Sequence, residues 1–231
     1  MGRGSSKISE SSSKPLGGGD GGGNGKEPIT VQPFAPGNLD LKGALGKPRK
    51  QPIGLQKALE GANPFYKGGA QGDFSENCQR AVVAYELRRR GYDVIALPTH
   101  TGDTLPAGGK WRGAFLHSKE IKVGASTPQK TQANLEKQMK SFGHGSRGIV
   151  RIPGHVFNVE NVNGKIRYVD AQTNTIYNSK NVFSRIGKKS SSITLIRTDN
   201  LRISDRAKKS VTPVTDTVKM IVNRRKKASS K

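Results

Sequence analysis

Cysteine is almost absent from this chain, since Cys78 is the only one among 231 residues. A single cysteine rules out an internal disulfide and the zinc sites that are built from several cysteines, and we expect neither a metal nor a cofactor. Long apolar runs are also missing. No stretch of about 18 apolar residues is available to span a membrane, and no apolar signal-peptide core follows the N-terminus. The sequence therefore predicts a soluble protein without a membrane span.

Apolar and acidic residues are both scarce. Hydrophobic residues make up 32% of the chain, which is low for a fully packed protein of this length, so we expect part of it to be disordered. The 17 acidic residues face 40 lysines and arginines, and the net charge is +23. Such an excess favours nonspecific attraction to nucleic acid or another polyanion, although simple solubility explains it equally well.

Composition divides the chain into three regions. Residues 1–70 contain 16 of the 29 glycines and are predicted to be a flexible tether rich in glycine, serine and proline, with a short docking segment around Leu55 to Leu59. Residues 71–204 are predicted to form the one folded domain, and residues 205–231 a basic tail. Four consecutive cations near the end of this tail are predicted to bind polyanions: Arg224, Arg225, Lys226 and Lys227.

Helix signals and strand signals both occur in the central region. A helix is predicted to begin after Asn77 and to end at Gly91, and a second one to begin at Thr127 and Pro128 and to end at Gly143. Apolar-rich runs that follow the second helix are typical of antiparallel strands. The fold class predicted from this pattern is α+β.

A hairpin is predicted at Asn163-Gly164, the strongest short turn signal in the chain. A two-residue turn there fixes the register of the two strands. In that register His155 and Asp170 are diagonal neighbours on one face, and Gln172 lies opposite His155. A carboxylate so placed can accept a hydrogen bond from the imidazole and leave the other ring nitrogen to take a proton from a thiol.

The single cysteine is a candidate nucleophile. Cys78 is placed at the start of the first predicted helix, where unpaired backbone amides and the helix dipole favour a thiolate. A helix-borne cysteine and a strand-borne histidine with an acidic neighbour are what cysteine–histidine catalysis needs. A lone cysteine is, however, most often a small buried apolar residue, and nothing in the sequence alone brings this helix to the hairpin.

Five sequence blocks between about residues 73 and 180 resemble the papain-fold toxin family of glutamine deamidases. The blocks, in the order of the family, are Asn77–Arg80, Arg90–Val94, Gly145–Gly148, Gly154–Val159 and Val169–Thr173. The resemblance implies a papain-like cysteine hydrolase fold in which an N-terminal catalytic helix packs on an antiparallel sheet.

The same resemblance implies roles for individual residues. Cys78 would be the nucleophile, His155 the base and Asp170 the group that orients the histidine, with Gln172 as a nearby polar residue of the site. Papain-like proteases also use an upstream glutamine to stabilise the oxyanion. The candidates here are Gln71, Asn77 and the backbone amide of Cys78.

The family further implies an effector or toxin carried by a bacterial secretion system or a phage particle. Its partners would be a protein substrate with a reactive glutamine, a phage capsid or secretion apparatus, and an immunity protein. The protein would be associated with a virion or delivered into a bacterial or host cytoplasm. Two alternatives stay open: a cysteine protease, which shares the first chemical step, and a noncatalytic virion (minor head) protein whose basic tails bind nucleic acid.

Overall fold

The computed structural model describes residues 45–68, 73–99, 111–177, 182–183 and 187–216. Gln71 and the four tail cations at positions 224–227 therefore lie outside the described residues. The helices are α1 (Leu55–Ala62), α2 (Cys78–Arg89) and α3 (Pro128–Ser141), with short 3₁₀ turns η2 (Arg112–Ala114), η3 (Gly187–Ser192), η4 (Asp205–Lys209) and η5 (Val214–Asp216). The strands are β1 (Val94–Ala96), β2 (Ile121–Lys122), β3 (Arg147–Ile152), β4 (His155–Val162), β5 (Lys165–Asp170), β6 (Thr175–Tyr177), β7 (Thr194–Arg197) and β8 (Val211–Pro213).

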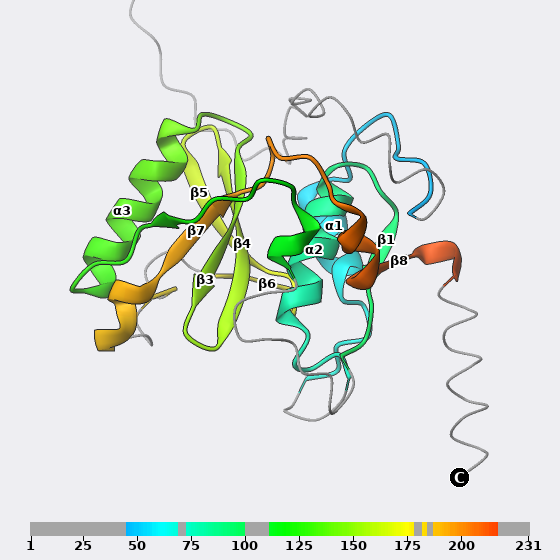
Figure 1. Cartoon of the computed structure of the whole chain (residues 1–231), viewed down its shortest axis with the longest axis horizontal. Coiled ribbons are helices and arrows are strands. Elements are labelled where there is room, and N and C mark those ends of the chain that lie inside the picture. Colours follow the sequence, from blue (N-terminus) through cyan, green and yellow to red (C-terminus); the bar gives the residue numbers. More distant parts are fainter. Residues whose placement is uncertain (1–44, 69–72, 100–110, 178–181, 184–186, 217–231) are drawn as a thin grey trace, which may run out of the picture.

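A six-stranded antiparallel sheet in the order β2-β7-β3-β4-β5-β6 forms the centre of the fold. Helix α3 lies on one side of this sheet, and helices α1 and α2 lie on the other, with the two-stranded sheet of β1 and β8 beyond them (Figure 1). Strand residues alternate between a core shared with α1 and α2 and a core shared with α3. The expected α+β class is thereby confirmed.

The hairpin of β4 and β5 has the predicted register. Val162 pairs with Lys165, and the ladder continues to the pair of Asn158 and Val169. The turn residues Asn163 and Gly164 both have positive φ, 52° and 80°, as a type I′ turn requires. The register of the hairpin could thus be read from its turn residues.

The two central helices begin and end near the predicted positions. Asn77 is the N-cap residue of α2, and its carbonyl oxygen accepts hydrogen bonds from the amides of Arg80 and Ala81. Beyond the helix, Gly91 has a φ of 91°, and a Cβ there would lie 2.8 Å from the carbonyl oxygen of Arg49. Glycine is therefore needed at this helix end.

The folded region extends further in both directions than the composition predicted. Within the expected tether, residues 45–68 are part of the fold, and α1 packs against α2 with four buried apolar residues in its core-facing stripe: Leu55, Ala58, Leu59 and Ala62. Their i, i+3, i+4, i+7 spacing explains why this helix packs although the region as a whole is rich in glycine. Within the expected tail, β8 pairs with β1 and η4 buries Ala207. The boundaries predicted at residues 70 and 205 therefore differ from those of the structure.

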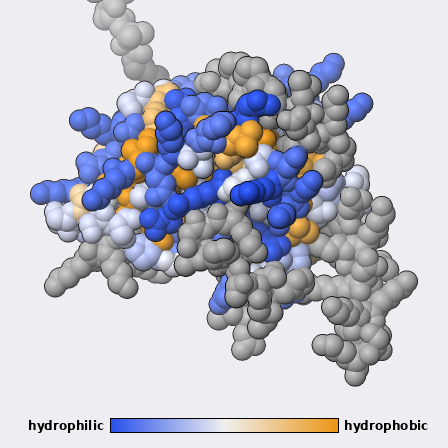
Figure 2. Space-filling model, in the orientation of Figure 1, coloured by the Kyte–Doolittle hydropathy of each residue, from blue (hydrophilic) through white to orange (hydrophobic). Residues whose placement is uncertain are grey.

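The surface is mostly hydrophilic in the view of Figure 2, where hydrophobic residues form small separate areas. In the described part of the chain the exposed large apolar residues are Leu116, Ile176 and Val214. A search of the described residues found no helix that is both long and apolar enough to cross a bilayer.

Candidate active site

His155 and Asp170 are in direct contact, as the hairpin register predicted. His155 is the first residue of β4 and Asp170 the last of β5, and Nε2 of the imidazole lies 2.9 Å from Oδ2 of the carboxylate. The Asp170 side chain is 2% exposed, and that of His155 is 22% exposed. The acid is thus buried behind a histidine that keeps one edge open to solvent.

Two further groups hold the carboxylate of Asp170. The hydroxyl of Tyr177, on β6, donates a hydrogen bond to Oδ2, and the amide of Gln172 donates one to Oδ1 at 3.0 Å. Burial raises the pKa of Asp170, but the hydrogen bond and charge of His155 and the hydrogen bonds from Tyr177 and Gln172 together bring it below its ordinary value. The carboxylate therefore stays ionised and fixed in orientation.

Cys78 completes this group from the other side of the sheet. It is the first residue of α2, it is partly buried, and it packs against the core that α1 and α2 share with the sheet. A side-chain hydrogen bond and the charge of Cys78 contribute to the raised pKa of His155, so the two side chains lie next to each other. Because Nε2 of His155 is engaged by Asp170, Nδ1 is the nitrogen left for the sulfur. The structure thus brings together the three residues that the sequence suggested as a triad.

The surroundings of His155 favour the protonated imidazole. Burial lowers the pKa of His155, but hydrogen bonds and negative charge from Asp170 and Cys78 outweigh it and raise the pKa from 6.5 to about 10. The imidazolium is accordingly the main form at neutral pH. A helix N-terminus next to it supplies further positive potential to the sulfur.

Asn77 and Gln172 are linked through Asn63, the residue that follows α1. The Asn77 side chain is fully buried and donates to Oδ1 of Asn63 at 3.1 Å and to the carbonyl of Leu97 at 3.0 Å. Asn63 in turn donates to the carbonyl of Gln172 at 2.9 Å. A continuous chain of hydrogen bonds therefore connects the residue before Cys78 with the residue that holds Asp170.

These contacts bear on the three oxyanion candidates. Both hydrogens of the Asn77 amide are donated to protein groups, and Gln71 lies outside the described residues. The backbone amide of Cys78 is in the first turn of α2, where helical geometry provides no acceptor for it. Gln172, expected near the site, uses its side-chain amide to bind the carbonyl of Ser75. Its side chain fastens the segment before α2 to the end of β5.

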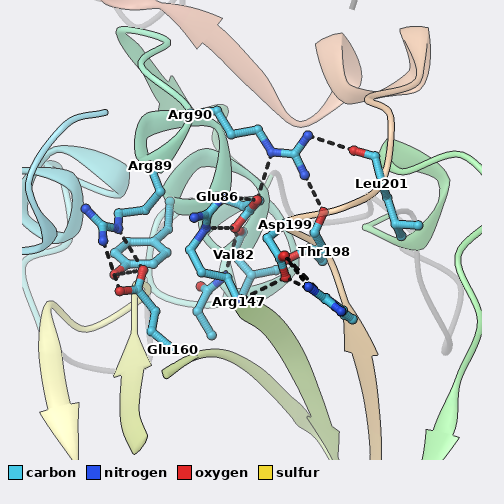
Figure 3. A network of polar contacts seen from close by, with 12 residues as sticks. Val82, Glu86, Arg89, Arg90, Arg147, Glu160, Thr198, Asp199 and Leu201 are labelled. Atoms are coloured by element: carbon cyan, nitrogen blue, oxygen red, sulfur yellow. Dashed lines mark hydrogen bonds and ion pairs between the residues drawn. The ribbon is translucent and has the colours of Figure 1, made fainter. Parts of the chain in front are cut away.

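A network of buried charges fixes α2 on the sheet (Figure 3). Glu160 on β4 accepts hydrogen bonds from Arg89, at 2.7 and 3.1 Å, and from the hydroxyl of Tyr85 at 2.8 Å. Glu86 accepts from Arg90 at 2.8 Å and from Arg147 on β3 at 2.9 Å. The helix that carries Cys78 is therefore joined by ion pairs to β3 and to the strand that carries His155.

Burial raises the pKa of Glu86, but its two arginine partners lower it to about 2, so the acid is charged at every physiological pH. Sequence reasoning did not identify this network, nor Tyr177 and Asn63. A signal existed for Glu86, which is an acid between the apolar residues Tyr85 and Leu87 of a helix. For Tyr177 the signal would have been a pairing of β5 with β6. For Asn63 it would have been the extension of the docking segment predicted around Leu55 to Leu59 into a helix that ends just before Asn63.

A comparison with known families shows what the central part of the chain is similar to. Residues 76–175 match the family described as papain fold toxin 1, glutamine deamidase. The predicted resemblance is confirmed. The matched papain-fold segment contains Cys78, His155 and Asp170, whereas Asn63 and Tyr177 lie just outside it. A search of curated proteins and a search of solved structures found no match. Among the described residues, no group of three or more His, Cys, Asp or Glu side chains is placed to hold a metal ion.

Proposed function

We propose that this protein is a cysteine-dependent amidohydrolase that deamidates a glutamine side chain of a target protein. The observation that carries the proposal is the contact of Cys78 with His155 and of His155 with Asp170, within a segment that matches a deamidase family. In this reading Cys78 is the nucleophile, His155 the general acid and base, and Asp170 the orienting carboxylate.

The first half of the reaction forms a thioester. The Cys78 thiolate attacks the carboxamide carbon of the target glutamine, and the amide at the start of α2 stabilises the resulting oxyanion. Imidazolium His155 donates its Nδ1 proton to the carboxamide nitrogen, and the C–N bond breaks to release ammonia. Asp170 keeps the ring in place and remains ionised throughout.

The second half consumes water. Neutral His155 removes a proton from a water molecule, the hydroxide adds to the thioester carbon, and the C–S bond breaks. The products are the free thiolate, with one water proton back on His155, and a carboxylic acid that releases the second water proton to solvent and becomes glutamate. A peptide bond or an acceptor amine would use the same first step, so the choice between deamidase, protease and acyl transfer depends on what binds next to Cys78.

The family also supports a role as an effector or toxin that a bacterium or phage particle delivers to a target cell. The supporting observation is the family description, which names its members toxins. A protein substrate is the partner that this function needs. The capsid, secretion apparatus, immunity protein and nucleic acid considered from the sequence are further proposals that follow from the same context.

Mass spectrometry of target-cell lysates tests the chemistry. We expect wild type, and not Cys78→Ala, to convert specific glutamines to glutamates, whereas Asp170→Asn should retain an alkylatable Cys78 with strongly reduced conversion. New peptide termini that depend on Cys78 would indicate a protease instead, and amine adducts a transferase. If Cys78 reacts slowly with iodoacetamide and His155→Ala leaves that rate unchanged, the noncatalytic alternative replaces the enzyme.

A further inference from the structure

Strand β3 brings an arginine to the start of helix α2. On the side of the sheet that faces α2, residues nearer the start of β4 contact α2 nearer the start of the helix. Glu160 accepts a hydrogen bond from Arg89 near the helix end, and Asn158 Nδ2 donates one to the carbonyl of Val82 at 3.2 Å. Two residues earlier on β4 is Val156, which lies in the same apolar cluster against which Cys78 packs. The residue directly opposite Val156 on β3 is Arg151. Arg151 is therefore placed on the α2 side of the sheet at the level of Cys78.

Arg151 shares one carboxylate with a second arginine. Arg112, in η2, forms an ion pair with Oε1 of Glu120, and Nε of Arg151 lies 3.8 Å from the same oxygen. The Arg112 guanidinium also lies over the ring of buried Trp111, at 5.6 Å from its centroid. Two guanidinium groups thus face a single acid, and the cluster of Arg112, Glu120 and Arg151 carries one net positive charge.

Some N–H donors of these two arginines have no hydrogen-bond acceptor among the described residues. Nε of Arg112 and Nε of Arg151 are buried and have no hydrogen-bond partner among the residues that the structure describes. Burial, and then the charge of Arg151, lower the pKa of Arg112. Buried donors without a partner are costly, and two arginines that repel one another favour a second anion between them. Both side chains keep about a third of their surface exposed, 32% and 33%, so a ligand can reach them.

We propose that Arg112 and Arg151 bind a carboxylate of the substrate protein, so that the enzyme selects a glutamine with an aspartate or glutamate close to it. Guanidinium groups are suited to this because their planar N–H forks match a carboxylate with two hydrogen bonds. The net charge of +23 would attract acidic substrates from a distance, while this pair would orient them at Cys78. The inference rests on the proposed function and names the class of substrate for that site.

The reactivity of Cys78 toward two alkylating reagents tests the pair without knowledge of the substrate. Iodoacetate and iodoacetamide both alkylate a thiolate with loss of iodide, but only iodoacetate carries a carboxylate. We expect Arg112→Gln and Arg151→Gln to lower the iodoacetate-to-iodoacetamide rate ratio by about two- to fivefold, the effect of one positive charge at roughly 10 Å. The iodoacetamide rate should stay near that of wild type, which shows that the site is intact.

Lys165→Gln is the matched control in the full chain. It also removes one positive charge, but Lys165 lies at the opposite end of the hairpin, about 23 Å from His155 along β4. We expect its rate ratio to equal that of wild type. If both arginine variants keep the wild-type ratio, or if Lys165→Gln lowers it as much as they do, the carboxylate site is overturned.

A pair of glutamine peptides separates this proposal from the proposed function. With glutamate or alanine next to the target glutamine, wild type should deamidate the glutamate peptide with a lower KM, and the arginine variants should lose this preference with little change in kcat on the alanine peptide. Deamidation of both peptides with equal KM overturns the carboxylate site and leaves the deamidase intact. An enzyme that reacts with both reagents as expected and deamidates nothing overturns the proposed chemistry while the rate ratios still support the anion site.

Discussion

The two faces of the central sheet are held in different ways. On the α3 face, Phe157, Tyr168 and Phe183 pack ring against ring with centroids 5.9 to 6.4 Å apart, around Leu135 and other apolar side chains. On the α2 face, apolar packing is accompanied by the buried ion pairs of Glu86 and Glu160. Apolar contacts are compatible with many placements of a helix on a sheet, whereas an ion pair between particular residues fixes one placement. Among the described residues, the face that carries Cys78 is the one on which ion pairs join a helix to the sheet.

The candidate active site lies where the two faces meet at one end of the sheet. The ring of His155 lies 6.3 Å from that of Phe157, which belongs to the α3 core, while Cys78 belongs to the α2 side. A displacement of α2 along the sheet would therefore change the distance between sulfur and imidazole.

The largest effect is expected from removal of the Glu160 carboxylate. Glu160→Ala leaves Arg89 and Tyr85 without their buried partner, and we expect the free energy of unfolding to fall by about 3–5 kcal/mol. Urea unfolding monitored by the fluorescence of Trp111 measures this. On the other face, Glu136→Ala removes the hydrogen bonds donated by Tyr168 and Gln132, with no ion pair among the described residues, and should cost only about 1 kcal/mol. Equal losses would show that the α2 face does not depend on its charges.

A cavity on the α3 face should reduce stability and spare the site. Leu135 of α3 is fully buried, and Leu135→Ala should lower the free energy of unfolding by about 2–4 kcal/mol. Since α3 packs on the side of the sheet away from Cys78, the iodoacetamide rate of the folded variant should equal that of wild type. A similar slowing of alkylation in Leu135→Ala and Glu160→Ala would remove the distinction between the faces.

Acid should weaken the ion pairs of Glu86 on the α2 face. The pKa of Glu86 is lowered from 4.5 to about 2 in the folded protein, so its ion pairs stabilise the fold fully above about pH 4.5 and lose this contribution as the pH falls through 2. We expect the stability difference between wild type and Glu86→Gln to shrink over that range in urea titrations at successive pH values. A difference that stays constant between pH 5 and pH 2 would contradict the role of Glu86.

The smallest effect on stability, with a clear effect on activity, is expected at Tyr177. Tyr177→Phe removes one donor to Asp170 and should change the free energy of unfolding by about 1 kcal/mol, while turnover falls about tenfold. Because the hydroxyl helps to hold the pKa of Asp170 below its ordinary value, the acidic limb of the pH–rate profile should move to higher pH. Unchanged kinetics and an unchanged profile would leave Tyr177 as a packing residue only.

What could be predicted from the sequence depended on local signals. Asn163-Gly164 determined the hairpin register and hence the contact of His155 with Asp170, and helix boundaries at Asn77 and Gly91 placed Cys78 at a helix start. The contact between that helix and the hairpin depends on Glu86, Glu160 and their arginine partners. Such long-range charge pairing has no periodicity in the sequence, because any of many arginines can serve as partner.

The missed elements share a second cause. The four apolar residues of α1 occur within a region whose glycine content indicated a tether, and a two-turn helix of this kind becomes stable only through its packing on α2. Asn63, at the end of that helix, could be recognised as a link between Cys78 and Asp170 only once α1 had been placed. The docking segment predicted around Leu55 to Leu59 covers part of this helix, but the average composition of the long region gave no sign of its packing on α2.

The position of β7 has a consequence for how the chain is made. β7 lies between β2 and β3, although residues 153–193 separate it from β3 in the sequence. At a synthesis rate of about 5–20 residues per second, roughly two to nine seconds therefore pass between the synthesis of β3 and that of β7. Throughout that time the emerging chain exposes an unpaired strand edge, to which other chains can add. Completion of the sheet that supports His155 thus follows the synthesis of β7, and a nascent chain carries Cys78 long before it carries the finished sheet.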